Sequence, residues 1–304
     1  MPEKPVAISP ATITALVVAI TTVSSSGPLI AYAAAPALVL AFWRNALATG
    51  LLIPFAALRR REELARLWRD GELRWSVLAG FALAAHFATW MSAAQLTSVA
   101  TATALVCSQP AWAGLIAFCR GQKLGVATWI GIGLAVIGAV IATGADVRLG
   151  HDAILGDILA LAGGLFAAVY TTLGERARQQ SSTASYTTVC YAVCAVLLGV
   201  ACLATGSPLM GFTAQTWLAI IGLTLGAQLL GHSMLNFALR EVSATMIGVL
   251  VLLEVPGAAL MAWLWLDQVP PAAAWPGVAL VVAGVAVVIL GNGRRQPREA
   301  PAEL

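Results

Sequence analysis

Long apolar runs, each close to the length of a membrane-spanning helix, occupy most of this 304-residue chain. A helix needs about 20 predominantly apolar residues to cross the hydrocarbon core of a bilayer, and it satisfies its own backbone hydrogen bonds there. Charged or Pro/Gly-rich breaks separate ten expected spans, at roughly 11–33, 36–57, 76–94, 97–118, 125–144, 155–174, 185–205, 215–237, 243–266 and 275–292. We therefore predict an all-α integral membrane protein with ten transmembrane helices.

The composition leaves too little polar surface for a soluble fold of this length. Hydrophobic residues make up 60% of the chain and charged residues 10%, whereas soluble domains carry about 25% charged residues. The net charge of +3 gives no reason to expect a nucleic acid as partner. The expected partners are the lipid bilayer, a small-molecule substrate and, where transport is coupled, protons. Ten helices in two halves can enclose a complete pathway, which is compatible with a monomer or a homodimer.

The distribution of Lys and Arg predicts how the chain is oriented. With the N-terminus in the cytoplasm, the segments on that side hold 15 of the 17 basic residues, and the opposite connectors hold only Arg148. The remaining one, Arg44, falls inside the second expected span. Cytoplasmic loops of membrane proteins carry an excess of Lys and Arg. We therefore expect a multi-pass protein of the cell membrane, in bacteria the inner membrane, with both termini in the cytoplasm.

An internal repeat divides the chain. Residues 95–144 and 241–290 align without gaps at a constant offset of 146. The punctuating residues that match are Pro110 with Pro256, Gln122 with Gln268, Gly131 with Gly277, and Gly138 with Gly284. A weaker register at an offset of 142 matches Trp75 with Trp217 and Gly80 with Gly222, where generic similarity among apolar helices is the competing explanation.

Each half of the repeat holds five expected spans. An odd number of spans makes the second half enter the membrane from the opposite side, so the two halves should be inverted. We predict a first repeat over 1–146 and a second over 147–304. Inverted repeats that meet at a site near the bilayer midplane are typical of secondary transporters.

Two stretches resemble a known family. Residues 88–141, "ATWMSAAQLTSVATATALVCSQPAWAGLIAFCRGQKLGVATWIGIGLAVIGAVI", are similar to the fourth and fifth helices of the EamA-type branch of the drug/metabolite transporter superfamily. Residues 229–270, "LLGHSMLNFALREVSATMIGVLVLLEVPGAALMAWLWLDQVP", resemble the corresponding stretch of the second half. The resemblance implies ten helices, a 5+5 inverted repeat and, usually, efflux of small metabolites, amino acids or drugs. The family often has a Glu after the fourth helix of each repeat, where this chain has Gln122 and Gln268, and no role is carried over to them.

Polar side chains inside the spans are the candidate substrate-binding residues. Gln228, His232 and Asn236 are spaced four apart in the eighth span, so on an α-helix they share one stripe. In the weaker register His86 matches Gln228 and Trp90 matches His232. Both halves then place such a pair at the same depth, which favours a cavity lining. The alternative is hydrogen bonding between packed helices.

Arg44 and Glu254 lie well inside spans, where a charge costs roughly 2.5–3.5 kcal/mol on insertion scales. Glu254 falls near the middle of the ninth span, and Arg44 lies about a third of the way into the second. They could form a structural ion pair. Otherwise Arg44 holds a substrate carboxylate, or Glu254 binds a substrate amine or a proton and couples export to proton entry.

The segment "TTVSSSGPLIA" (21–31) interrupts the first span. Pro28 removes a backbone donor, which frees carbonyl groups around Ser24. Interrupted helices near the midplane are where transporters place ligand-binding backbone, although proline kinks also occur with no ligand nearby. We therefore keep Ser24 as a candidate substrate-binding residue.

Aromatic and proline residues within spans complete the set of candidates. Trp43 and Tyr170 could line a cavity, with a packing or interfacial role as the alternative. Pro110 and Pro256 are expected to kink the fourth and ninth helices symmetrically and so to shape a gate.

The chain lacks the motifs of ATP binding, of serine hydrolases and of metal sites, G-x-x-x-x-G-K-[ST], G-x-S-x-G and H-E-x-x-H. We therefore expect no enzyme activity, no cofactor and no metal. The leading hypothesis is an alternating-access exporter of a small polar metabolite such as an amino acid, driven by protons or by the substrate's own gradient. The alternatives are an exporter of cationic or lipophilic drugs, with Glu254 binding the cation, and a membrane scaffold that transports nothing.

Overall fold

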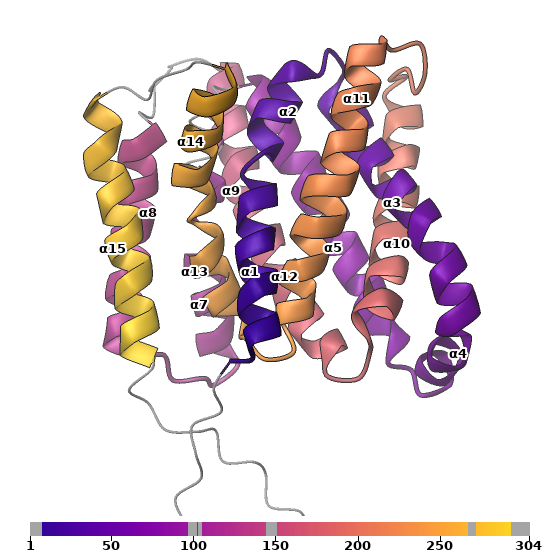
Figure 1. Ribbon diagram of the computed structural model, residues 1–304, viewed down its shortest axis with the longest axis horizontal. Helices are drawn as coiled ribbons and strands as arrows, with labels where there is room; N and C mark the ends of the chain where they lie inside the picture. The colour runs from indigo at the N-terminus through magenta and orange to yellow at the C-terminus, as the bar shows by residue number, and fades with distance from the viewer. Residues whose placement is uncertain (1–7, 97–101, 103–104, 144–150, 267–271, 293–304) are drawn as a thin grey trace, which may run out of the picture.

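Figure 1 shows the computed structural model, which describes residues 8–96, 102, 105–143, 151–266 and 272–292. These residues form helices joined by short connections, and no strand occurs among them. The helices of the first half are α1 (Pro10–Val23), α2 (Ser26–Tyr32), α3 (Ala37–Arg59), α4 (Arg61–Arg69), α5 (Leu73–Leu96), α7 (Gln109–Cys119) and α8 (Val126–Thr143). Those of the second half are α9 (His151–Arg178), α10 (Thr183–Ala204), α11 (Ala214–Gly222), η1 (Leu223–His232), α12 (Ser233–Ala238), α13 (Ala244–Val251), α14 (Glu254–Leu266), η2 (Ala272–Ala274) and α15 (Trp275–Asn292).

The helices match the expected spans in type and place. Within the described residues, eight helical stretches are long and apolar enough to cross a membrane, and Val126–Ala142 is a shorter apolar helix. The expected fourth span, 97–118, lies partly outside the described residues. The all-α fold is confirmed, and the count of ten transmembrane helices stays a prediction.

Helices α8 and α15 show how the two halves are related. A Cβ atom built on Gly131 would lie 2.6 Å from the carbonyl oxygen of Gly284, and one on Gly138 would lie 2.7 Å from that of Gly277. Residue numbers that rise along α8 meet numbers that fall along α15, so the helices are antiparallel. Because Gly277 and Gly284 are the repeat equivalents of Gly131 and Gly138, each half offers the same surface to the other, as in a two-fold contact. The halves are therefore inverted.

The same relation recurs at the opposite edge of the molecule. Helices α3 and α10, the second span of each half, pack along each other there, while α8 and α15 form the other edge (Figure 1). Between the edges α5 packs along α9, and α1 packs along η1 and α12. The two halves thus interlock through equivalent helices, with their shared core between the edges.

The glycine contact between α8 and α15 can be tested with a matched pair of variants. Gly138→Ala places a methyl group 2.6 Å from the backbone nitrogen of Val281, so the helices must separate. We expect the free energy of unfolding to fall by about 1–3 kcal/mol, measured as a lower melting temperature in detergent. Gly133→Ala, on the same helix with nothing within 4 Å of the new methyl group, should be neutral or stabilising. Equal effects of the two substitutions would contradict the close packing.

The basic connectors gather at one end of the bundle. Helix α4 lies at the same end as the beginning of α1 and the end of α15 (Figure 1). It docks on the α9–α10 connection, because Arg66 Nη2 donates to the carbonyl oxygen of Gln180 at 3.1 Å and Glu63 Oε1 accepts from the backbone N–H of Ser182. The charged segment 59–75 is therefore partly helical, at the end that the charge distribution predicts to be cytoplasmic.

At this end the N-cap of α1 is tied to the connection between α12 and α13. Ser9 donates to Glu241 through its backbone N–H at 2.9 Å and its Oγ at 3.0 Å. The N–H of Ser9 lowers the pKa of the Glu241 carboxyl below its ordinary value. A lowered pKa means that the contact is complete at neutral pH and is lost as the pH falls through that pKa.

We therefore expect a pH-dependent difference in amide hydrogen exchange near Ser9. At neutral pH the Glu241→Ala variant should exchange the Ser9 amide faster than the unmodified protein. In acid, below the lowered pKa of Glu241, the two should exchange at the same rate. A difference that persists unchanged in acid would show that the carboxylate is not what protects this amide.

Candidate functional site

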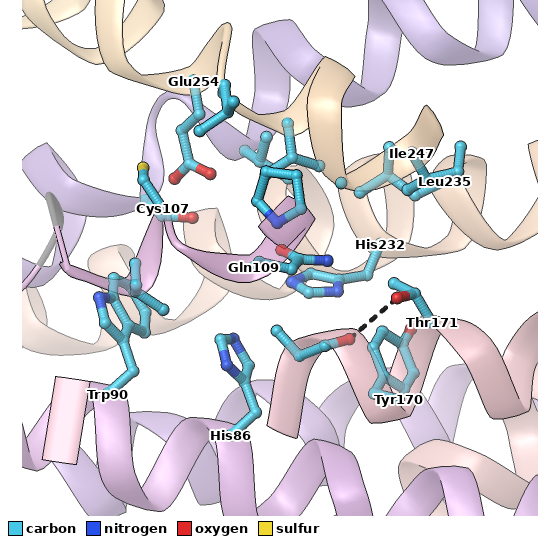
Figure 2. Close-up of a pocket in the computed structure, with 18 of the residues that line it drawn as sticks. His86, Trp90, Cys107, Gln109, Tyr170, Thr171, His232, Leu235, Ile247 and Glu254 are labelled. Carbon is cyan, nitrogen blue, oxygen red and sulfur yellow. Dashed lines mark hydrogen bonds between the residues drawn. The ribbon is translucent and has the colours of Figure 1, made fainter. Parts of the chain in front are cut away.

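A cavity lies between the two halves, and both contribute to its wall (Figure 2). Its volume is about 80 Å³, and one buried water needs about 10–15 Å³ on the same measure. There is room for several waters or a small ligand. The polar and aromatic side chains of the wall are Ser26, Arg44, His86, Phe87, Trp90, Cys107, Gln109, Tyr170, Thr171, His232 and Glu254.

Helix interruptions border this cavity. The first span breaks at Ser24–Ser25, and the ninth breaks at Leu252–Leu253. In the fourth span a turn at 107–108 precedes α7. Pro110 and Pro256 follow these last two breaks in the same repeat position. Both stand near the start of a helix, where the missing N–H of proline leaves no hydrogen bond unmade. The expected symmetric distortion of these two spans is confirmed.

Glu254 owes its place in an apolar run to the break before it. It is the first residue of α14, where the free N–H groups and the helix dipole favour a negative charge. In Figure 2 its carboxylate faces the same space as His86 and His232. No salt bridge within 4.0 Å joins Glu254 to Arg44 among the described residues. In this conformation the structural ion pair is not formed.

Hydrogen bonds anchor Arg44 in the wall of the same cavity. Its Nε donates to Gln228 Oε1 at 2.8 Å, and Gln228 Nε2 donates to Asn45 Oδ1 at 3.1 Å. Asn45 is anchored in turn by its Nδ2, which donates to the carbonyl oxygen of Ala41 at 2.9 Å. The guanidinium carbon of Arg44 lies 4.5 Å from the centre of the Phe87 ring. Its Nη2 is buried and has no hydrogen-bond partner.

The cavity holds one histidine from each half, His86 on α5 and His232 at the end of η1. The Nδ1 of His86 lies 2.9 Å from the carbonyl oxygen of Gly163; because a carbonyl only accepts, Nδ1 carries the hydrogen and Nε2 stays an acceptor. The ring of His86 lies parallel to that of Trp90, with centroids 6.0 Å apart. The Nδ1 of His232 is buried without a partner.

Comparison with known proteins identifies the family. The model of the EamA-like transporter family matches residues 7–144 and 154–290, one segment in each half. The chain belongs to the EamA-like transporter family. It is therefore a multi-pass membrane transporter, as its apolar helices indicate.

A comparison with solved structures supports the fold alone. One solved crystal structure has a TM-score of 0.75 and 20% sequence identity, and covers 93% of this chain and 96% of that chain. A search of curated proteins finds no match to this chain.

Six of the ten predicted binding residues of this EamA-like transporter lie in the cavity wall. They are Arg44, His86, Trp90, Tyr170, His232 and Glu254. The cavity wall does not include Ser24, Trp43, Gln228 or Asn236. The predicted contact of these four with substrate has no support in this geometry.

Two of the four lie behind the wall because the eighth span is not an α-helix throughout. Residues Leu223–His232 form a π-helix, whose wider turns displace the stripe that α-helical spacing predicts. Gln228 is turned toward Arg44 and Asn45. Asn236 is buried, and its side chain exchanges hydrogen bonds with the hydroxyl of Tyr170 at 2.7 and 2.9 Å. Both residues position a side chain of the cavity wall.

The other two residues lie elsewhere. Ser24 packs against Gly257 of α14, where a Cβ atom would collide with the Ser24 Oγ. Trp43 donates from Nε1 to the carbonyl oxygen of Leu209 at 2.8 Å, and its ring packs edge-on against Trp217. Ser24 thus joins two interrupted helices, and Trp43 has the packing role that was its alternative.

Sequence reasoning also missed polar residues of this transporter's wall. Gln109 directly precedes Pro110, and Ser26 directly follows the break in the first span. Thr171 is the neighbour of Tyr170. Their proximity to a predicted break or a candidate residue was the available signal.

Proposed function

We propose that this EamA-like transporter is a secondary-active, alternating-access exporter of small polar metabolites, with amino acids as the leading substrate class. The observation that carries the proposal is the pair of opposite charges on the wall of one cavity. Arg44 offers an unpartnered Nη2 atom to a carboxylate, and Glu254 offers a carboxylate free of any salt bridge with Arg44 to an amine. A zwitterion satisfies both.

The interrupted helices support alternating access around this cavity. The breaks at Ser24–Ser25 and Leu252–Leu253 let the two ends of a span move separately, and their contact through Ser24 and Gly257 couples the first and ninth spans. Inverted repeats allow the same movement to open the opposite side. The driving force is either the proton gradient, with Glu254 as the protonated group, or the substrate's own gradient.

The second candidate is an exporter of cationic or lipophilic drugs. It is favoured by the aromatic wall around Glu254, formed by Phe87, Trp90 and Tyr170, because such rings attract cations. Arg44 argues against it, since a buried guanidinium repels a cation. A scaffold that transports nothing has no use for these charges in an apolar bundle.

Transport assays in proteoliposomes with an imposed pH gradient separate these candidates. The purified protein is tested against a panel of zwitterionic amino acids and against a lipophilic quaternary ammonium ion. We expect amino acids to be transported and to compete with one another, and the cation to be excluded. Transport of the cation, with amino acids neither moving nor competing, would establish the drug exporter instead.

We also propose that this protein lies in a bacterial inner membrane with both termini cytoplasmic, acting as a monomer or a homodimer. The complete cavity within one chain supports a functional protomer. The basic end of the bundle supports the orientation. Labelling single cysteines placed in α4 and in the 206–212 connection, from either side of a sealed vesicle, tests which end faces the cytoplasm.

A further inference from the structure

We propose that Arg44 and Glu254 together make the number of protons carried depend on the charge of the substrate. A carboxylate without an amine binds together with one proton, which Glu254 takes up, whereas a zwitterionic amino acid binds without one. The inference rests on the proposed function, because it assigns the two ends of the substrate to these residues.

Arg44 has a buried hydrogen-bond donor that no protein group satisfies. Its side chain is 1% exposed, and a buried cation is costly unless it is paired. The surrounding contacts use its Nε and its face, through Gln228 and Phe87, and leave Nη2 unsatisfied. A guanidinium in this state suits a carboxylate, whose two oxygens can accept from neighbouring N–H groups.

Glu254 is an acid on the wall of the same cavity as Arg44. The other titratable side chains that line the cavity are His86 on α5, Cys107 before α7, Tyr170 on α9 and His232 at the end of η1. Helices α1, α2, α8 and α15 pack against α14, and the only titratable side chain on them is Tyr32, which is exposed at the end of α2. With the histidines neutral, Arg44 and ionised Glu254 leave the cavity with no net charge.

This charge balance determines how many protons bind together with each substrate. A carboxylate that pairs with Arg44 adds one negative charge, and protonation of Glu254 restores neutrality: one anion and one proton enter the site together. An amino acid adds no net charge, since its ammonium group meets Glu254 while its carboxylate meets Arg44. Glu254 then stays ionised, and no proton is bound.

The matched probes are propionate and L-alanine, which share a three-carbon acid and differ by the amine. Binding to the full-length protein in lipid nanodiscs is measured by calorimetry in two buffers of different ionisation enthalpy, which counts the protons taken up. We expect one proton per propionate and none per alanine at a pH at which Glu254 is ionised in the empty cavity. Propionate affinity should then rise about tenfold for each unit of falling pH, by reciprocal linkage, and alanine affinity should not change.

Variants assign these effects to the two residues. Glu254→Gln should bind propionate without proton uptake and without pH dependence, whereas Glu62→Gln, which removes an exposed acid on α4, should behave as the unmodified protein. Arg44→Gln should bind neither propionate nor L-alanine. The proton counts come from the unmodified protein, so they test the proposed difference in proton uptake even if Arg44→Gln fails to fold.

Three results would overturn the inference. They are equal proton counts for the two probes, proton uptake that survives Glu254→Gln, and no binding of either probe at millimolar concentrations. In the last case, transport of another amino acid in proteoliposomes would leave the proposed function standing. Absence of any amino acid transport would instead remove the proposed function.

Discussion

Replacing Arg44 by glutamine should abolish amino acid transport. Truncating one partner of a buried, hydrogen-bonded charge pair costs about 2–5 kcal/mol, so substrate binding should weaken about 30-fold to several thousand-fold. The loss has two sources, because glutamine offers no charge to the substrate carboxylate and breaks the link to Gln228. Substrate binding and uptake are measured on protein whose melting temperature shows that it is folded.

Arg44→Lys should transport amino acids nearly as poorly as Arg44→Gln, although it keeps the charge. An ammonium group has no planar fork that can bind Gln228 on one side and a carboxylate on the other. The control is Arg61→Gln, which removes an exposed arginine of α4. If Arg44→Lys transports as well as the unmodified protein, Arg44 contributes only its charge, and the fixed geometry around it has no part in recognition.

Much of this fold was predictable from the sequence, because some residue types have the same structural effect in any fold. Proline has no N–H in any structural context, so Pro110 and Pro256 predict interruptions of their helices even when the tertiary contacts are unknown. The register of 146 predicted the equivalence of α8 and α15, and their glycines prove to be the contact. A charge inside an apolar run is costly in any fold, and for that reason Arg44 and Glu254 could be singled out.

The cavity wall was less predictable, because the π-helix depends on distant partners. The carbonyl oxygen of Gln228 accepts from Ser233 Oγ at 3.3 Å and from the hydroxyl of Tyr191 at 3.4 Å. Tyr191 is on α10, so this support is tertiary. Periodicity read along one helix assumes α-helical turns, and it therefore placed Gln228 and Asn236 in the cavity together with His232.

The anchoring of Arg44 was hidden for a related reason. Asn45 is the next residue in the chain, and side chains at consecutive positions of one helix do not face each other. The two residues are joined through Gln228, which comes from the other half of the molecule. Such a bridge exists only once the halves have interlocked.

Glu254→Gln should separate binding from proton coupling. The amide is nearly the same size as the carboxyl group, so the start of α14 and the cavity wall are preserved. A substrate amine loses a charged partner, which is worth about 1.5–3 kcal/mol, and amino acid affinity should fall about 10- to 150-fold. Uptake of propionate should continue but should no longer respond to an imposed pH gradient, because the variant has no group that takes up the proton.

The measurement is proteoliposome uptake of both probes, with and without the pH gradient, and with Glu62→Gln as the control. Undiminished proton-driven uptake in Glu254→Gln would remove this acid from the coupling mechanism. The histidines would then be the remaining candidates, since His86 and His232 line the same cavity. A His232→Gln variant could confirm that outcome, because glutamine keeps a polar group beside Phe87 and Tyr170 but cannot titrate.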